Sequence, residues 1–211
     1  MNTLKFMPKK LREIYVKNIP NAGMKQDAER YTSRIYFIGL IIAVFVSLIL
    51  FFALKIMPVL SFFLSFIIVE IFFYFLISLK ATARIKKIEA LFPDFIQLMS
   101  SNLRAGMTVD NSFLSSARPE LAPLDEEISR TGKEIATGQD IVLAFNNMAK
   151  RIDSNKIKKI IALIISGLRS GGNISTLLEN TSSSMRERQF LEERAASNVL
   201  MYVIFIFISI S

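Results

Sequence analysis

The chain lacks the side chains that enzymes most often use as general bases, metal ligands and thiol nucleophiles, and its serine hydroxyls have no partner base. None of its 211 residues is histidine or cysteine, so it lacks the commonest general base, the commonest metal ligand and any thiol nucleophile. The hydroxyls of Ser112, Ser115 and Ser116 therefore have no candidate base to activate them. We expect no enzymatic activity and no cofactor.

Two other local patterns are weak candidates for a metal or a phosphate site. The acidic run at 125–127 stands where a helix is expected to begin, and three successive helical residues point in different directions. The run Gly171-Gly172-Asn173 lacks the preceding strand and the Gly-x-x-x-x-Gly-Lys-Ser/Thr spacing of a phosphate-binding loop. We interpret the first as a helix start and the second as a corner between two helices, and we predict no metal site.

A stretch of apolar, helical character occurs twice in the chain, 65 residues apart and in gapless register. The copies cover residues 95–106 and 160–171. Each predicts an apolar helix, a glycine stop and a capped second helix. The identical positions are 96/161, 98/163, 101/166, 103/168, 104/169 and 106/171.

The corners that end these two copies are our candidates for contact with a partner protein. Arg104 and Arg169 occupy equivalent positions in the last turn of their helices. A cation is expected there from the helix dipole alone, so a dipole role and a partner-contact role both stay open. The candidate contact residues are Arg104, Gly106, Arg169, Gly171, Gly172 and Asn173.

Two long apolar blocks predict a transmembrane hairpin over residues 35–79. Residues 35–54 carry no charge, and residues 59–79 carry only Glu70. Twenty helical residues span about 30 Å, the thickness of one bilayer core. The net charge is +8, and residues 1–34 hold eight Lys and Arg against three Asp and Glu. Because further basic residues follow the second block, we predict that both ends of the hairpin are cytoplasmic.

Glu70 lies near the middle of the second predicted span. An ionised carboxylate costs at least about 2.5 kcal/mol there, so the side chain is expected to face protein or to be protonated. One hypothesis is a proton or ion site, or a docking point for a polar group of a partner helix. The other is a hydrogen bond that fixes helix packing, and we favour this one slightly because no second intramembrane charge accompanies Glu70.

Residues 80–198 predict a cytoplasmic, antiparallel bundle of six helices without strands, so that the whole chain is an all-α membrane protein. Residues 199–211 predict the start of a further, truncated transmembrane helix, since they are too short to cross a bilayer. We expect the chain to be a fragment of a longer protein. The expected helices are 81–105 with a restart at Pro93, Thr108 to about Ala117, Pro123 to Gly138, 141–151 after Asp140, 157–170 after Asp153 or Ser154, and Ile174 onward after Asn173.

Several segments of the cytoplasmic part resemble the type II secretion F domain in the same order. The first half contains ALFPDF at 90–95 and LRAGMTV at 103–109, and the second contains GLRSGGNI at 167–174 and RER at 186–188. The similarity covers roughly residues 80–198. Its second corner is most similar to the branch of Tad pilus and archaellum proteins (the TadC and FlaJ types).

The resemblance implies a non-enzymatic platform protein of the cytoplasmic membrane, at the base of a type IV pilus-like filament. It implies a cytoplasmic hexameric secretion ATPase, pilin-like subunits and a homodimeric or paralogous copy as partners. The bilayer, and not nucleic acid, accounts for the basic N-terminal segment. The alternative that we keep is a membrane transporter or channel subunit that uses Glu70.

Overall fold

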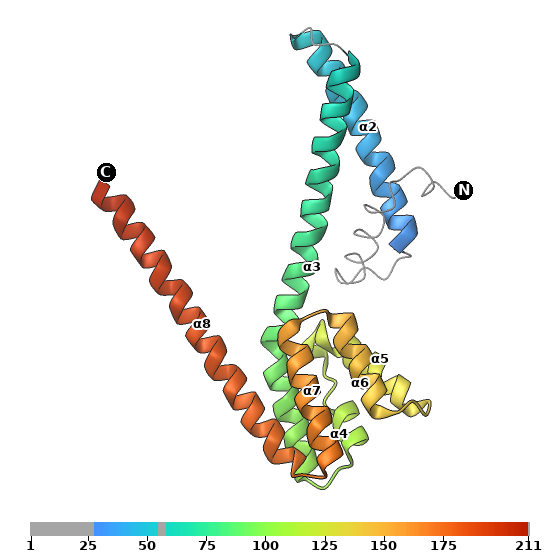
Figure 1. Cartoon of the computed structure of the whole chain (residues 1–211), viewed down its shortest axis with the longest axis vertical. Helices are drawn as coiled ribbons and strands as arrows, with labels where there is room; N and C mark the ends of the chain where they lie inside the picture. Colours follow the sequence, from blue (N-terminus) through green and yellow to red (C-terminus); the bar gives the residue numbers. More distant parts are fainter. Residues whose placement is uncertain (1–27, 55–57, 211) are drawn as a thin grey trace. The chain divides into compact units, whose positions relative to one another are not determined.

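The structure, a computed structural model, describes residues 28–54 and 58–210 of the chain (Figure 1). These residues form seven α-helices and one short 3-10 turn, with no strand among them. The predicted all-α fold class is therefore confirmed for the described part of the chain. Most of the basic segment 1–34, the connection 55–57 and Ser211 lie outside it.

The chain divides into two units, Met1–Ile85 and Lys86–Ser211. The boundary falls inside α3 (Pro58–Arg104), a single helix of 47 residues. The predicted membrane segment 59–79 and the predicted helix 81–105 are thus parts of one helix. Residues 78–92 contain neither glycine nor proline, so nothing in the local sequence interrupts the helix where the composition changes.

In the first unit, α2 (Ala28–Leu54) lies antiparallel to the beginning of α3. The Ser65 hydroxyl donates to the Ala43 carbonyl at 3.1 Å, and a Cβ added to Gly39 would lie 3.1 Å from Oε1 of Glu70. Gly39, Ala43 and Ser47 recur at every fourth position and are buried. Small residues at this spacing let two helix backbones approach closely. The two helices therefore pack as an antiparallel hairpin. The topology of this hairpin in a membrane stays a prediction.

Apolar side chains cover much of the helical surface in the first unit. Among the described residues one stretch, Phe62–Arg104, is long and apolar enough to cross a membrane. Ile67, Ile71 and Phe75 on it are each more than half exposed. The described apolar stretch of α2, Phe37–Ile49, is shorter than a bilayer core. Apolar surface of this extent marks a contact with lipid or with another protein.

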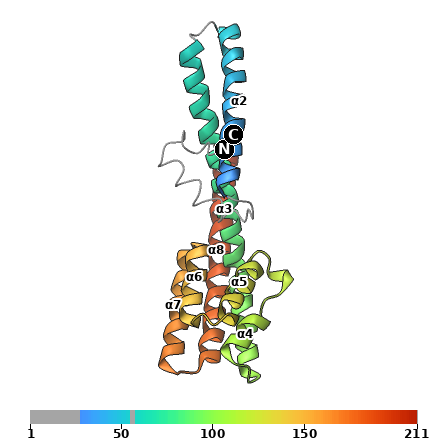
Figure 2. The ribbon, with the colours of Figure 1, turned by 90° about the vertical axis from the view of Figure 1, so that its right-hand side faces the viewer.

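The second unit consists of the end of α3 and six further elements that follow it. Neighbouring helices pack on each other in sequence order, α4 on α5, α5 on α6, α6 on α7 and α7 on α8 (Figure 2). The elements are α4 (Val109–Ser115), η2 (Pro119–Leu121), α5 (Leu124–Ala136), α6 (Ile141–Ile152), α7 (Asn155–Ser170) and α8 (Ile174–Ile210).

The predicted helix starts and stops are confirmed where the sequence named a cap. Thr108, Asp140 and Asn173 each accept a hydrogen bond from the backbone amide three residues later, at 3.4, 2.9 and 3.2 Å. Of the two residues proposed to cap α7, Ser154 does so at 3.2 Å, while Asp153 ends α6 in a left-handed conformation with φ of 52°. Glycines with positive φ end the three helices that were predicted to stop at them. They are Gly106, Gly138 and Gly171.

One expectation about chain breaks needs correction. Pro93 does not restart a helix but lies inside α3, where its carbonyl accepts a hydrogen bond from the buried Ser182 hydroxyl of α8 at 3.0 Å. Packing against α8 therefore outweighs the lost helical donor of the proline. Pro119 begins the 3-10 turn η2, after α4 has ended at Ser115. The predicted start of a membrane helix at 199–211 belongs to α8, which continues unbroken to Ile210, and its place in a membrane stays a prediction.

Two long helices, α3 and α8, run antiparallel through the second unit. Ser100 donates to the Ser175 carbonyl at 2.8 Å, Ser182 to Pro93 as described, and Gln189 to the Glu89 carbonyl at 3.1 Å. Residue numbers therefore rise along α8 as they fall along α3. These side chain to backbone bonds fix the register of the two helices along about ten residues of α3.

The core of this unit is organised around a chain of aromatic rings. Phe95 lies 5.6 Å from Phe92 and 5.4 Å from Phe113, and Phe113 lies 4.9 Å from Phe145, measured between ring centroids. The rings come from α3, α4 and α6 and are at most 2% exposed. Aromatic pairs at these distances add to the stabilisation that burial alone provides. This core holds in place the two corners that carry the candidate contact residues.

Candidate functional site

The two repeated corners have the same local construction and lie at the same end of the second unit. Gly106 has φ of 87° and Gly171 has φ of 66°, which is the left-handed region that glycine adopts without strain. The Ser100 hydroxyl and the Ser175 carbonyl join the helices next to the corners at 2.8 Å. The repeat therefore places two equivalent helix ends side by side.

The two arginines of these corners differ in their contacts. Arg104 Nη1 lies 2.7 Å from Glu179 Oε2, and both side chains are partly exposed. Among the described residues Arg169 has no ion-pair partner and is exposed. The position equivalent to Glu179 in the first copy is Leu114, so no carboxylate is available to Arg169 from the matching place. Of the two corner arginines, Arg169 is therefore the one whose charge is left unpaired within residues 28–54 and 58–210.

The remaining candidate residues are exposed at the corner between α7 and α8. Gly171, Gly172 and Asn173 are all solvent accessible, and Gly172 and Asn173 line a hollow of about 310 Å³. No ligand chemistry is built into this hollow, whose other lining residues are serine, glycine and aliphatic side chains. Contact of this corner with a partner protein stays a prediction.

A longer groove of about 590 Å³ follows α7 and α8 away from this corner. It shares Leu163 and Leu177 with the corner hollow, so the two are continuous. A Cβ added to Gly167 would lie 2.5 Å from Cδ2 of Leu177, which means that Leu177 rests in space left by the glycine. At the equivalent place of the first copy, Asn102 donates to the Ser116 hydroxyl at 3.1 Å instead.

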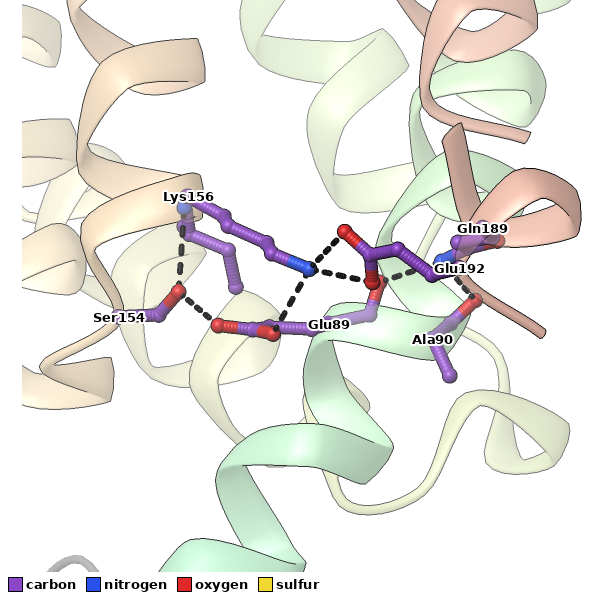
Figure 3. Close-up of polar contacts among 7 residues, drawn as sticks. Glu89, Ala90, Ser154, Lys156, Gln189 and Glu192 are labelled. Carbon is purple, nitrogen blue, oxygen red and sulfur yellow. Dashed lines mark hydrogen bonds and ion pairs between the residues drawn. The ribbon is translucent and has the colours of Figure 1, made fainter. Parts of the chain in front are cut away.

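One end of this groove is closed by a polar cluster from α3, α7 and α8 (Figure 3). Both oxygens of Glu192 accept hydrogen bonds from Lys156 Nζ at 2.8 Å, and Glu89 Oε2 lies 4.0 Å from the same nitrogen. The Ser154 hydroxyl donates to the other oxygen of Glu89. Gln189 donates to the carbonyls of Glu89 and Ala90, at 3.1 and 3.4 Å. The cluster ties α8 to the start of the bundle part of α3.

The hydrogen bond to Glu192 raises the pKa of Lys156 above its usual 10.5. The negative charges of Glu192 and Glu89 raise it further, while desolvation opposes the shift. A raised lysine pKa in the folded state means that the stabilisation is complete below pH 10.5 and is lost only as the pH rises through the folded value. The cluster is therefore intact throughout the physiological range.

Three neighbouring lysines at the beginning of α7 differ in their contacts. Lys156 belongs to the polar cluster, and Lys158 pairs with Asp153 at 2.5 Å. Lys159 is exposed in the groove and has no ion-pair partner within the part of the chain that the structure describes.

Comparison with known protein families identifies the family of the second unit. The family model described as type II secretion system protein F matches residues 95–211. The chain belongs to this family. The match begins at the first residue of the first repeat copy and includes both corners. No curated protein and no solved structure matches the chain.

Membership in the protein F family indicates the general function of the chain and its association with a membrane. The family occurs in platform proteins of secretion and pilus machines and is associated with membranes. The long apolar helix of the described residues agrees with that association. The family model does not separate the TadC and FlaJ branch from other members.

Glu70 lies against α2 inside the hairpin of this protein F chain. Its side chain is buried, and one carboxylate oxygen approaches the backbone at Gly39. Gly39 has no side chain, so the carboxyl group of Glu70 has room against α2. The hydrogen-bond hypothesis and the ion-site hypothesis for Glu70 both stay predictions.

Sequence reasoning missed the strongest ionic cluster of the F domain. The guanidinium of Arg151 donates to Glu127 and Glu134 at 2.9 Å each and to the Thr131 hydroxyl at 2.7 Å. Glu127, Thr131 and Glu134 are spaced at four and three residues, so they share one face of α5. That spacing was the available signal, and it gives Glu127 of the acidic run a role in packing α6 on α5.

Proposed function

We propose that this chain is a non-enzymatic platform protein of the cytoplasmic membrane in a type IV pilus-like machine, of the type II secretion, Tad pilus or archaellum kind. In this role it couples a cytoplasmic hexameric secretion ATPase to the movement of pilin-like subunits. The observation that supports the proposal most is the family match over residues 95–211. The second corner resembles the Tad pilus and archaellum branch, and we propose that branch.

The proposed topology has both ends of the hairpin and the whole second unit on the cytoplasmic side. It rests on the positive charge of residues 1–34 and on the basic residues that follow the second apolar block. We also propose that the platform works as a homodimer or together with a paralogous copy.

A labelling experiment tests the topology. Single cysteines in place of Met57 and Thr137 are expected to react from opposite sides of the membrane. Met57 stands between the two predicted spans in the sequence, and Thr137 is exposed at the end of α5. The chain has no other cysteine, so an impermeant maleimide added to intact cells should label only position 57. Labelling of both positions from outside would contradict the hairpin.

We propose that the ATPase binds at the two corners, where Arg169 offers an unpaired cation. Replacing Arg169 by glutamate is expected to weaken association of the full chain with its secretion ATPase about tenfold or more, since reversing a contact charge replaces attraction by repulsion. Association is measured by co-purification and by titration with labelled ATPase.

The Arg104 corner needs a control that separates surface charge from internal pairing. Arg104→Glu alone also breaks the pair with Glu179. The double variant Arg104→Glu with Glu179→Arg keeps an opposite-charge pair at the same place. If the double variant restores ATPase association, Arg104 acts by holding α3 to α8. If neither Arg104→Glu nor Arg169→Glu weakens association, the corners are not the ATPase surface.

A further inference from the structure

The groove between α7 and α8 has an apolar floor that the rest of the unit leaves uncovered. The floor consists of Ile160, Leu163, Leu177 and Met185, and Leu163 is 44% exposed. Together with the corner hollow, the groove is lined by α8 residues from Ile174 to Glu192. That length of helix rises about 27 Å. The surface is thus long enough to receive about five turns of a helix.

The internal repeat supplies a comparison within the same molecule. Ile160, Leu177 and Thr181 of the groove are partly exposed. The equivalent residues of the first copy, 65 positions earlier, are at most 1% exposed. They are Phe95, Ser112 and Ser116. The same stripe is therefore covered by the bundle in one copy and open in the other, and an open apolar stripe of this kind indicates an interaction surface.

The charges along the groove indicate which partner fits it. Lys159 and Arg188 line the groove, are exposed, and have no ion-pair partner in residues 28–54 and 58–210. The two carboxylates of the groove, Glu89 and Glu192, both lie at its far end against Lys156. The uncompensated charge beside the apolar floor is positive.

This charge argues against the chain's own N-terminal segment as the occupant. Residues 1–34 hold eight Lys and Arg against three Asp and Glu, so they would bring like charges toward Lys159 and Arg188. Like charges across an interface disfavour binding. We therefore expect the segment that occupies the groove to be acidic, unlike the basic N-terminal segment.

We propose that this groove binds an amphipathic α-helix of another protein, one with an acidic margin. The apolar stripe of that helix lies on Leu163 and Leu177, and its flanking carboxylates meet Lys159 and Arg188. Apolar anchors at helical spacing supply the affinity in this mode of recognition, and the charged margin selects the partner. The groove is a second surface beside the corner at Arg169, so the proposal goes beyond the ATPase contact proposed above.

Designed peptides test the groove in the full chain, held in nanodiscs of neutral lipid. The first peptide is an 18-residue helix with leucines at i, i+3, i+4 and i+7 and glutamates beside them, and the second has lysines in place of the glutamates. The fluorescence anisotropy of the labelled glutamate peptide should report saturable binding. The lysine peptide is expected to bind at least about tenfold more weakly, because it carries the same sign as the groove.

Matched variants locate the binding. Leu163→Asp should abolish binding of the glutamate peptide, and the pair Lys159→Glu with Arg188→Glu should weaken it at least about tenfold and favour the lysine peptide. Leu143→Asp and Lys150→Glu place the same changes on the exposed face of α6 and should leave binding unchanged. Circular dichroism of each variant confirms that its helices are retained.

Three results of the peptide experiments would overturn the proposal. They are equal binding of the glutamate and lysine peptides, binding that survives Leu163→Asp, and an absence of peptide binding to the folded chain. A decrease in sedimentation mass caused by Leu163→Asp would also overturn it, since the groove would then be a contact between two copies of this chain. None of these results decides the ATPase contact, which is measured separately through Arg169.

Discussion

Replacing Phe113 by alanine is expected to lower the free energy of unfolding of the second unit by about 3–5 kcal/mol. Phe113 is 1% exposed and stands between the rings of Phe95 and Phe145. Its removal leaves a cavity at the place where α3, α4 and α6 meet. The helix that carries it, α4, has only seven residues, so it depends on this anchor and not on its own helical propensity.

Hydrogen exchange of the full chain in detergent measures the effect on the second unit alone. Amides of α6 and α7 should exchange faster in Phe113→Ala by a factor that corresponds to the lost free energy. Leu143→Ala on α6 is the control, because Leu143 is 53% exposed and its truncation should change the free energy by less than about 0.5 kcal/mol. Equal exchange in the two variants would contradict the central place that we give to the aromatic chain.

Replacing Arg151 by alanine is expected to cost about 2–3 kcal/mol of the same unit's stability. The change removes hydrogen bonds to Glu127, Glu134 and Thr131, where the three charged side chains are between 12% and 23% exposed. Losing one partner of a fully buried ion pair costs about 3–5 kcal/mol, and the remaining access of water to these carboxylates reduces that figure. Arg151→Lys should recover only part of the loss, because one ammonium group cannot reproduce the fork of a guanidinium.

Arg130 provides the matched control for this cluster. Its Nε lies 3.8 Å from the same Glu134 carboxylate, but its side chain is 64% exposed. An exposed pair of this kind contributes less than about 0.5 kcal/mol. Thermal unfolding should therefore separate Arg151→Ala from Arg130→Ala. If the two variants unfold at the same temperature, the Arg151 contacts do not contribute to stability as we expect.

The sequence was most informative where the controlling contacts are local. Thr108, Asp140 and Asn173 cap their helices through bonds to amides only three residues away. Gly106 and Gly171 end helices because a left-handed backbone conformation suits glycine. Such features depend on a few neighbouring side chains, so they can be recognised before any fold is known. The repeat and the family resemblance are recognisable for the same reason.

The sequence was misleading where a distant helix outweighs a local preference. Pro93 predicts a helix restart, but α3 continues through it because α8 packs there and Ser182 bonds to its carbonyl. Gly39, Ala43 and Ser47 stand four residues apart in the sequence. Their role in packing α2 closely on α3 depends on the α3 side chains that lie opposite them. The local sequence of one helix does not predict which residues of a second helix will pack against it.

The sequence by itself determined that the chain is helical, where most helices of its second unit begin and end, that one corner is repeated, and that the chain resembles the F domain. It also made Arg104 and Arg169 equivalent. Only the tertiary structure separated them, because Glu179 faces the first arginine while Leu114 occupies the matching position for the second. Caps and stops arise from neighbours in the chain, whereas the ion pair of Arg104 depends on Glu179, which lies 75 positions away. The repeat therefore produces two corners of similar local structure. Tertiary packing pairs the arginine of the first corner with Glu179 and leaves the arginine of the second corner unpaired among the described residues.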